Sequence, residues 1–256
     1  MQQAVNKFFD LNRRICSSIE DVLPAAFTRH LHTSYRYMVA DYLNAAQDLV
    51  VADIGSGKEC PYLPAIAIPK GHTIIAVDAS EAELRQNTRC QLRVVADACG
   101  SNLPFAAESV DLITSRSVLE HLRDNQVFFR SCHRVLRPRG CIVHVFPCRF
   151  SPFSLINSIL PDRLARALLY FLHPAWQHEC GFKVYYDNCS YSEIRRLLDS
   201  TGYELIHCEL RYYQAIYCNF LAPLYLVMLL YDAVAYLSGI RDLSCQMLIL
   251  ARKHDV

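Results

Sequence analysis

The chain has 256 residues, enough for one large domain with a substantial core, and 52% hydrophobic with 20% charged residues argues against disorder. Its formal net charge is +1, so composition gives no electrostatic reason to expect nucleic acid as a partner. The 12 cysteines are scattered without a CxxC pair, and no apolar leader opens the sequence. These features predict free buried thiols and a cytoplasmic protein.

Residues 1–47 predict an N-terminal helical cap. Apolar residues from Phe8 to Leu23 recur at helix-like spacing, and a second helix is expected at 33–46. Its aromatic cluster Tyr35-Arg36-Tyr37 could fold over a ligand or pack on a sheet. Packing is the commoner use of an aromatic stripe and is the favoured interpretation.

Strand and helix patterns alternate through the middle of the chain. Buried strands are expected at 50–54, 73–78, 92–97, 109–115 and 141–146, with helices at 80–87 and 118–136. Ser80 is the expected N-cap of the first helix, and Pro138 with Gly140 should end the second. This alternation is typical of an α/β fold, with a parallel sheet and helices on both of its faces.

The alternation breaks after the fifth strand, where a helix at 152–172 and an aromatic-rich stretch around Trp176, Phe182, Tyr185 and Tyr186 predict an insertion or cap. The remaining expected elements are a helix, a sixth strand and a seventh strand, at 192–201, 203–210 and 243–252. We therefore predict one domain over 48–256, with insertions at 147–189 and 213–242.

An apolar segment at 216–237 separates the last two strands. It is about as long as a membrane span, but Asn219, Pro223 and Asp232 interrupt it, and a span would separate two strands of one sheet. A buried or homodimer-forming helical hairpin is favoured. A membrane-surface or lipid-binding face is the alternative, because exposed apolar patches usually mark interaction sites.

Three expected strands end in acidic residues, Asp53, Asp78 and Asp97. Ligands of open α/β sheets bind at this carboxyl edge. The first strand runs into Gly55 and Gly57, which permit a tight turn close to a ligand, and Asp78 follows Gly57 by 21 residues. That spacing suits an acid that accepts hydrogen bonds from ribose hydroxyls, so a nucleoside is the expected ligand.

Five ordered stretches resemble the successive motifs of class I S-adenosylmethionine-dependent methyltransferases. The nearest likeness is to the small-molecule, type 11-like branch, which includes ubiquinone-pathway enzymes. The stretches are Val-Ala-Asp-Ile-Gly-Ser-Gly (51–57), Ala-Val-Asp-Ala-Ser (76–80), Ala-Asp-Ala-Cys-Gly-Ser-Asn-Leu-Pro-Phe (96–105), Ser-Val-Asp-Leu-Ile-Thr-Ser-Arg-Ser-Val-Leu-Glu-His-Leu (109–122) and His-Arg-Val-Leu-Arg-Pro-Arg-Gly (133–140).

The resemblance implies a Rossmann-like sheet of seven strands in the order 3-2-1-4-5-7-6, with only the last strand antiparallel. It also implies S-adenosylmethionine as cofactor. The resemblance further implies which part of the cofactor each residue contacts. The methionine moiety would contact Asp53, Gly55, Ser56 and Gly57, and the ribose would contact Asp78. The adenine would contact Ala79, Asp97 and Ala98, and the methyl-donor pocket would be lined by Ser115.

Methyl transfer from an activated sulfonium needs alignment of donor and acceptor, and a base where the acceptor is a hydroxyl. His121, six residues after Ser115 and expected in the first turns of the following helix, is the candidate base, with His178 as a second candidate. His144 is expected to be a sheet residue. No metal site is predicted, because His173, His178 and Glu179 do not form an HExxH pattern.

The sequence thus predicts a methyltransferase acting on a small, hydrophobic acceptor, with O-methylation favoured. A catalytically silent methyltransferase-like partner subunit is one alternative. A nicotinamide-dependent oxidoreductase is less favoured, because Pro61 or Tyr62 stands where its third glycine should be. A nucleic-acid methyltransferase lacks support, since no Asn-Pro-Pro-Tyr-like tetrapeptide follows the fourth strand and no basic face is evident.

Overall fold

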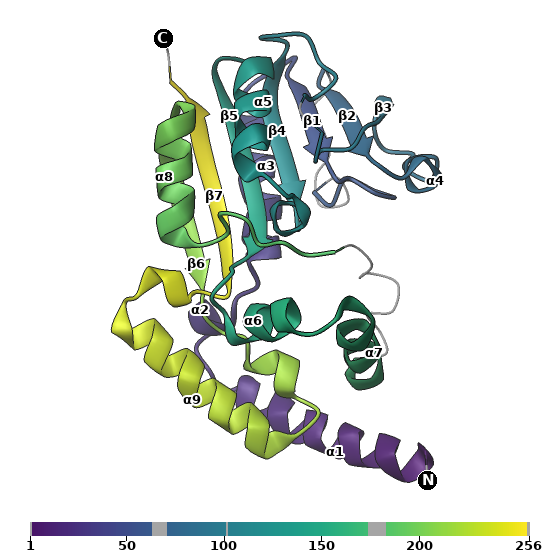
Figure 1. The fold of residues 1–256 in the computed structure, drawn as a ribbon, viewed down its shortest axis with the longest axis vertical. Coiled ribbons are helices and arrows are strands. Elements are labelled where there is room, and N and C mark those ends of the chain that lie inside the picture. Colours follow the sequence, from purple (N-terminus) through teal and green to yellow (C-terminus); the bar gives the residue numbers. More distant parts are fainter. Residues whose placement is uncertain (1, 63–70, 101, 174–182, 255–256) are drawn as a thin grey trace.

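The computed structural model describes residues 2–62, 71–100, 102–173 and 183–254. Its centre is a seven-stranded sheet in the order β3-β2-β1-β4-β5-β7-β6, in which β7 alone is antiparallel to both of its neighbours (Figure 1). The predicted fold class and strand order are therefore confirmed. The strands are β1 (Val50–Ile54), β2 (Thr73–Asp78), β3 (Leu92–Val95), β4 (Val110–Arg116), β5 (Leu136–Pro147), β6 (Tyr203–Arg211) and β7 (Gln246–Lys253).

Helices cover both faces of the sheet (Figure 1). Alternate residues of β1 face opposite ways, so that Val51 joins a core with α3 (Leu31–Asn44), while Ala52 and Ile54 join the core under the other helices. Those helices are α5 (Asn125–Val135) and α8 (Tyr191–Thr201). Burial on both faces explains why the strands read as continuous apolar runs.

Two expected helices are shorter in the structure. Ser80 does cap α4 (Glu81–Leu84), accepting the N–H of Glu83 at 3.3 Å, but the helix is a single turn. The prediction of a helix at 118–136 is wrong for the first of these residues, which form a 3₁₀ turn, η2 (Leu119–His121). α5 starts only after Asp124, whose carboxylate accepts the N–H of Val127 at 2.9 Å and acts as a new N-cap.

The strand after α5 is longer than the expected 141–146. β5 begins at Leu136, directly after α5, so Pro138 and Gly140 lie in the strand itself. Its pairing with β4 shifts register between Val110 and Leu112, which accommodates a proline that cannot donate a ladder hydrogen bond.

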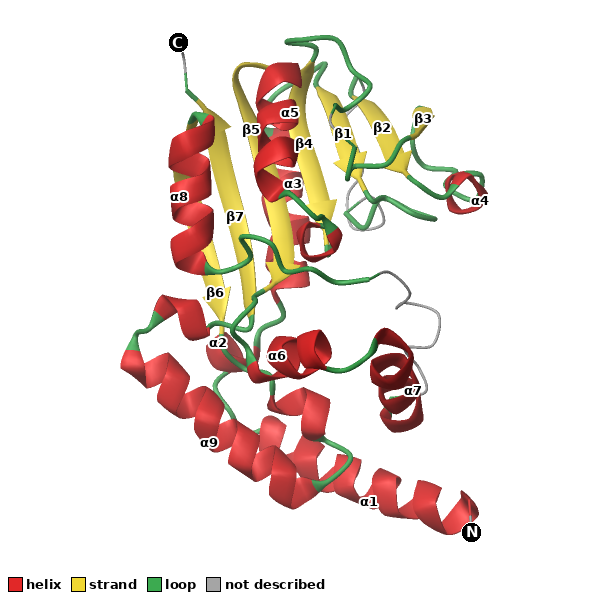
Figure 2. Cartoon of the chain, viewed as in Figure 1, coloured by secondary structure: helices red, strands yellow, loops and turns green. Residues whose placement is uncertain are grey.

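A layer of helices lies beyond the carboxyl ends of the parallel strands (Figure 2). The helix expected at 152–172 is two helices, α6 (Pro152–Ile159) and α7 (Asp162–Leu172), because Pro161 cannot continue the first. α1 (Gln2–Glu20) packs against α9 (Ala222–Ser238), where Asn12 Oδ1 accepts the N–H of Ala222 at 2.8 Å. The short α2 (Ala25–Thr28) connects α1 to α3. The division into a cap over 1–47 and a domain over 48–256 stays a prediction.

The apolar segment does not form the helical hairpin that was favoured, and contact with a second copy of the chain stays a prediction. It forms a 3₁₀ turn, η4 (Ala215–Cys218), and one helix, α9 (Ala222–Ser238), before the turn η5 (Arg241–Leu243). Three α9 residues are buried, Tyr225, Asp232 and Ala235, whereas the outer side chains Leu224, Leu226, Val227, Leu230, Val234, Tyr236 and Leu237 are exposed. Across the described ranges, no helix has both the length and the hydropathy to cross a bilayer.

Candidate functional site

The loop after β1 is a tight turn built on two glycines with positive φ, +68° at Gly55 and +53° at Gly57. The N–H groups of Gly55 and Ser56 both donate to the carbonyl of Val77, at 2.8 and 3.2 Å, which ties the turn to the end of β2. A Cβ on Gly55 would lie 2.4 Å from Cγ2 of Val118. Both the conformation and the space therefore require glycine at position 55.

Asp78, the last residue of β2, holds this turn in place. Its Oδ2 accepts the N–H of Gly57 at 2.9 Å, and its Oδ1 accepts the N–H of Ser80 at 2.8 Å. A carboxylate offers roughly four acceptor positions, so about half of them remain for another ligand. Asp78 thus joins the two turns and still has capacity for a pair of ribose hydroxyls.

The residues predicted to flank the adenine lie after β2 and β3. Ala79 precedes α4 and is exposed, and Ala98 is half-buried against the core under α5. Asp97 is exposed two residues beyond the end of β3, and its Oδ1 accepts the N–H of Cys99 at 2.8 Å. Because β2 and β3 are adjacent and parallel, their ends place all three residues at one edge of the sheet.

Asp53 lies beneath the glycine turn, only 1% exposed. Its Oδ1 accepts the hydroxyl of Thr114 at 2.6 Å, and burial raises its pKa to about 6 despite that hydrogen bond. Thr114 could not be singled out from the sequence, because its hydrogen bond with Asp53 depends on the pairing of β1 with β4.

The turn fits the cofactor that the sequence led us to expect. Asp53 Oδ2 and Ser56 Oγ are buried and have no hydrogen-bond partner in the described part of the chain. Buried polar atoms normally have partners. The ammonium and carboxylate of a methionine moiety would supply donors and acceptors here, while Asp78 would receive the ribose.

Ser115 and His144 form a buried pair across β4 and β5. Both are 0% exposed, and Ser115 Oγ lies 2.7 Å from Nδ1 of His144. Burial lowers the pKa of His144 to about 3, so the ring stays neutral. The prediction that His144 is a sheet residue is confirmed. With its hydroxyl engaged, Ser115 has only its backbone to offer a ligand.

His121 lies in η2 rather than in the first turns of α5. Its Nδ1 lies 2.9 Å from the carbonyl of Lys183, which only a ring N–H can satisfy, so in the neutral ring Nε2 carries the lone pair. Burial lowers the pKa of His121, which keeps it neutral. His121 is thus equipped to accept a proton at Nε2.

Glu120, adjacent to His121, was overlooked in the sequence. Its Oε1 lies 3.8 Å from Nε2 of His121, it is 4% exposed, and burial raises its pKa to about 8. Glu120 Oε2 has no partner among the described residues. The position of Glu120 beside the candidate base could have drawn attention to it in the sequence. The burial of its carboxyl, however, cannot be predicted from a single sequence.

The segment after β5 is only partly described. His178 lies outside the described residues, as do Trp176 and Phe182. His173 ends α7 and its Nε2 lies 2.9 Å from the carbonyl of Tyr217, which joins α7 to η4. The described cysteines are all unpaired, and the described residues contain no group of three or more metal-ligating side chains placed to hold a metal ion.

A family model described as a methyltransferase domain matches residues 52–144. A Mycobacterium tuberculosis protein named as a probable S-adenosylmethionine-dependent methyltransferase is 34% identical over 110 residues, which cover 42% of this chain and 39% of that protein. An uncharacterized methyltransferase from Mycobacterium sp. strain KMS is 31% identical over 138 residues, 51% of this chain and 54% of its own length. The chain thus matches between two-fifths and about half of the length of these curated relatives.

Solved structures share the fold over more of the chain. The complex of the Haloferax volcanii Trm112 methyltransferase activator with a methyltransferase gives a TM-score of 0.58 at 17% identity, covering 98% of both chains. Geranyl diphosphate C-methyltransferase from Streptomyces coelicolor gives a TM-score of 0.55 at 14% identity, and the match covers 86% of this chain and 80% of that protein. Residues 52–144 therefore form a methyltransferase domain, and this part of the chain is similar to proteins named as probable S-adenosylmethionine-dependent methyltransferases.

Proposed function

We propose that this protein transfers a methyl group from S-adenosylmethionine to a hydroxyl of a small, apolar acceptor. The observation that carries the proposal is the glycine turn fixed by Asp78 inside a stretch that matches a methyltransferase domain. In this proposal Asp53, Gly55, Ser56 and Gly57 hold the methionine moiety and Asp78 holds the ribose. Ala79, Asp97 and Ala98 border the adenine, and Ser115 lines the donor pocket through its backbone.

The protein's own contribution to the reaction is alignment and removal of one proton. The bound cofactor supplies the electrophilic methyl group. His121 accepts the hydroxyl proton at Nε2, because its Nδ1–H is engaged with Lys183. The carboxyl of Glu120 lies 3.8 Å away, and because burial raises its pKa to about 8 it faces the charged ring at neutral pH as a polar neutral group rather than as a counter-ion. His178 is a second candidate for this role.

An apolar acceptor is supported by the helices around the carboxyl edge of the sheet. α6 exposes Leu155, Ile156 and Ile159, and α7 exposes Leu164, Leu168 and Phe171. Large exposed apolar patches usually mark binding surfaces. The exposed face of α9 would equally suit contact with a membrane surface or with a second copy of this chain.

The cofactor is tested by titrating S-adenosylhomocysteine and NAD separately and following thermal stability. Stabilisation by S-adenosylhomocysteine alone is expected. Stabilisation by NAD alone would instead favour an oxidoreductase. Binding without turnover on any acceptor would favour a catalytically silent partner subunit.

Transfer is tested with labelled S-adenosylmethionine and long-chain acceptors that carry either a hydroxyl or an amine. Labelling of the hydroxyl acceptor alone supports O-methylation. His121→Gln should lower kcat by about a hundredfold while leaving S-adenosylhomocysteine affinity unchanged. Equal labelling of the amine acceptor, or full activity of His121→Gln, would contradict this mechanism.

A further inference from the structure

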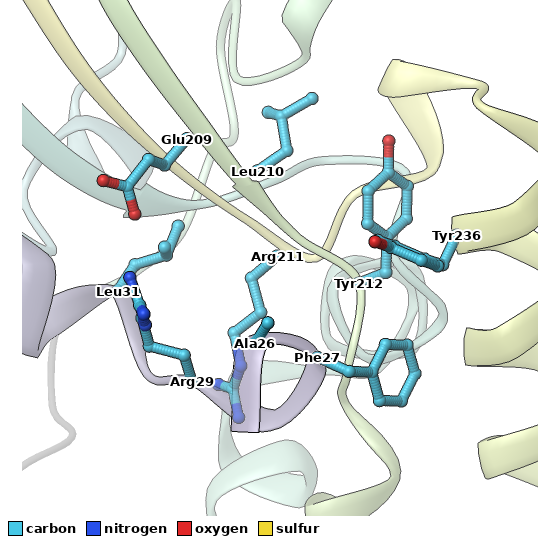
Figure 3. Close-up of a pocket in the computed structure, with 9 residues that line it drawn as sticks. All are labelled: Ala26, Phe27, Arg29, Leu31, Glu209, Leu210, Arg211, Tyr212 and Tyr236. Carbon is cyan, nitrogen blue, oxygen red and sulfur yellow. The ribbon is translucent and has the colours of Figure 1, made fainter. Parts of the chain in front are cut away.

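A second recess lies away from the glycine turn. It is a pocket of about 200 Å³, walled by α2 and the turn after it, by the end of β6 and by Tyr236 of α9 (Figure 3). Two arginines, Arg29 and Arg211, line it from one side, and Tyr212 and Tyr236 lie on the other. None of the residues assigned to the cofactor lines this pocket.

Arg211 is a buried guanidinium with spare donors. It is 5% exposed, its Nη2 donates to the carbonyl of Thr28 at 3.3 Å, and the group lies 5.3 Å over the ring of Tyr213. Its Nε has no acceptor among the described residues. Burying a guanidinium without enough acceptors is costly, so this side chain is suited to an anion that enters the pocket.

The charged side chains that line the pocket are Arg29, Arg211 and Glu209, so two positive charges outnumber one negative charge. Within the described ranges, no ion pair involves Arg29 or Arg211. The carboxylate of Glu209 is directed to His207, with Oε1 3.2 Å from Nε2, and forms no ion pair with either arginine among the described residues. Asp232 is close enough for Arg211 to lower its pKa, yet its Oδ2 accepts two backbone N–H groups.

The pKa values of the histidines that follow Arg29 are lowered in part by the positive charges around the pocket. Burial is the main cause that lowers the pKa of His30 to about 4 and that of His32 to about 3, and the charges of Arg116 and Arg211 contribute to both shifts. Both rings are therefore neutral at physiological pH. The positive charge of the pocket therefore comes from the two guanidiniums, which can bind a phosphate through several charge-assisted hydrogen bonds.

An apolar surface starts at the rim of the pocket. Tyr236 belongs to α9 and makes edge-to-face contacts with Phe27 and Tyr212 at 5.6 and 5.8 Å. Along α9, Val227, Leu230, Val234 and Leu237 are 59 to 81% exposed, and the helix has no charged residue except the buried Asp232. An anion pocket beside an uncharged apolar helix matches a molecule with a phosphate at one end and a hydrocarbon tail at the other.

We propose that Arg29 and Arg211 bind the phosphate of an amphiphilic lipid whose tail lies along the exposed face of α9. The site is separate from the cofactor turn and does not depend on methyl transfer. Tyr212 and Tyr236 form the boundary between the polar and apolar parts of the ligand, where amphipathic rings are favoured.

The proposal is tested by isothermal titration of the full chain with dihexanoyl phosphatidic acid, a short-chain phosphate lipid. Dihexanoyl phosphatidylcholine, which is zwitterionic, and inorganic phosphate, which has no tail, serve as comparison ligands. We expect Arg29→Gln, at an exposed position, and Arg211→Lys, which keeps the charge but loses the planar fork, each to weaken phosphatidate binding about tenfold. Arg85→Gln, directly after the distant α4, is the matched control and should bind like the wild type.

The tail is tested with Leu230→Gln, which should weaken phosphatidate binding but leave inorganic phosphate binding unchanged. Cosedimentation with phosphatidylcholine vesicles, with and without phosphatidic acid, then separates a lipid in a bilayer from a free one. Unchanged phosphatidate affinity in Arg29→Gln, or inorganic phosphate binding as tightly as phosphatidate, would overturn the proposal. Equal S-adenosylhomocysteine affinity in all variants shows that the cofactor site is intact, so failure here is distinguishable from failure of the methyltransferase proposal.

Discussion

The carboxylate of Asp78 accepts the N–H of Gly57 across 2.9 Å, so the end of β2 fixes the turn that follows β1. Its second oxygen accepts the N–H of Ser80 at the start of α4. One acid thus sets the positions of two loops, its own and the glycine turn that lies 21 residues earlier in the sequence. The same carboxylate is the proposed ribose acceptor, which couples the shape of the cofactor site to its chemistry.

Asp78→Asn should weaken S-adenosylhomocysteine binding by about ten- to a hundredfold. The amide keeps the size of the side chain but has only one oxygen, so it cannot accept from Gly57, from Ser80 and from a ribose together. Isothermal titration measures the affinity. Glu81→Gln is the control, because this neighbour on α4 only forms an exposed ion pair with Arg85. Unchanged affinity in Asp78→Asn would remove Asp78 from the site.

Gly55→Ala should destabilise the fold and abolish measurable S-adenosylhomocysteine binding. A Cβ there would lie 2.4 Å from Val118, in addition to the strain of φ +68°. Gly239→Ala provides a matched control, since Gly239 has the same φ of +68° but no atom within 4 Å of its Cβ position. It should lose about 1 kcal/mol of stability from strain alone and bind normally. Similar losses in the two variants would show that the contact with Val118 is unimportant.

The fold was predictable where one strong local pattern determined it. The apolar run that ends in Asp78 located β2 to the residue, the run that ends in Asp53 located β1 to within one residue, and Gly202 marks the end of α8 with φ +83°. The predictions that failed concerned helix boundaries and exposure, which depend on tertiary contacts. Asp124 starts a new helix inside an apparently continuous pattern, and the apolar run of α9 gave no sign of which side would be exposed.

The candidate site was predictable for residues placed by backbone topology, because adjacent parallel strands bring Asp53, Asp78 and Ser115 to one edge. The burial and the hydrogen-bond partners of these side chains were not predictable. Nothing in the sequence distinguishes the buried carboxyl of Asp53 from the accessible one of Asp97, and the pairing of Asp53 with Thr114 requires the register of β1 on β4.

Glu120→Gln should make the protein less sensitive to alkaline pH. Burial raises the pKa of Glu120 from 4.5 to about 8, so between these values the folded state binds more protons than the unfolded state. The free energy of unfolding contributed by this group therefore falls as pH rises through that window. Glutamine does not ionise, so the variant should gain stability relative to the wild type from about pH 5 to pH 9.

Urea unfolding across that pH range measures the Glu120 effect. Glu204→Gln, at an exposed position of β6, is the control and should follow the wild type at every pH. A constant difference between Glu120→Gln and the wild type at all pH values would mean that Glu120 does not titrate in this window.

Asp232→Ala should destabilise the protein by about 2 to 4 kcal/mol without changing S-adenosylhomocysteine affinity. Asp232 Oδ2 accepts the N–H groups of Gln214 and Ala215, each at 2.7 Å, and so fastens α9 to the chain leaving β6. Alanine would leave two buried donors without an acceptor. Asp232→Asn retains one carbonyl oxygen in the same place and should lose clearly less stability.

Hydrogen exchange gives the local readout for these two variants. The amides of Gln214 and Ala215 should lose protection in Asp232→Ala, and the loss should extend into α9 if the helix detaches as a unit. The amides of α8 are the internal reference, because that helix packs in a different core. Retained protection at Gln214 and Ala215 would show that other contacts, such as the 3.1 Å hydrogen bond between the hydroxyls of Tyr213 and Tyr225, suffice to hold α9 on the sheet.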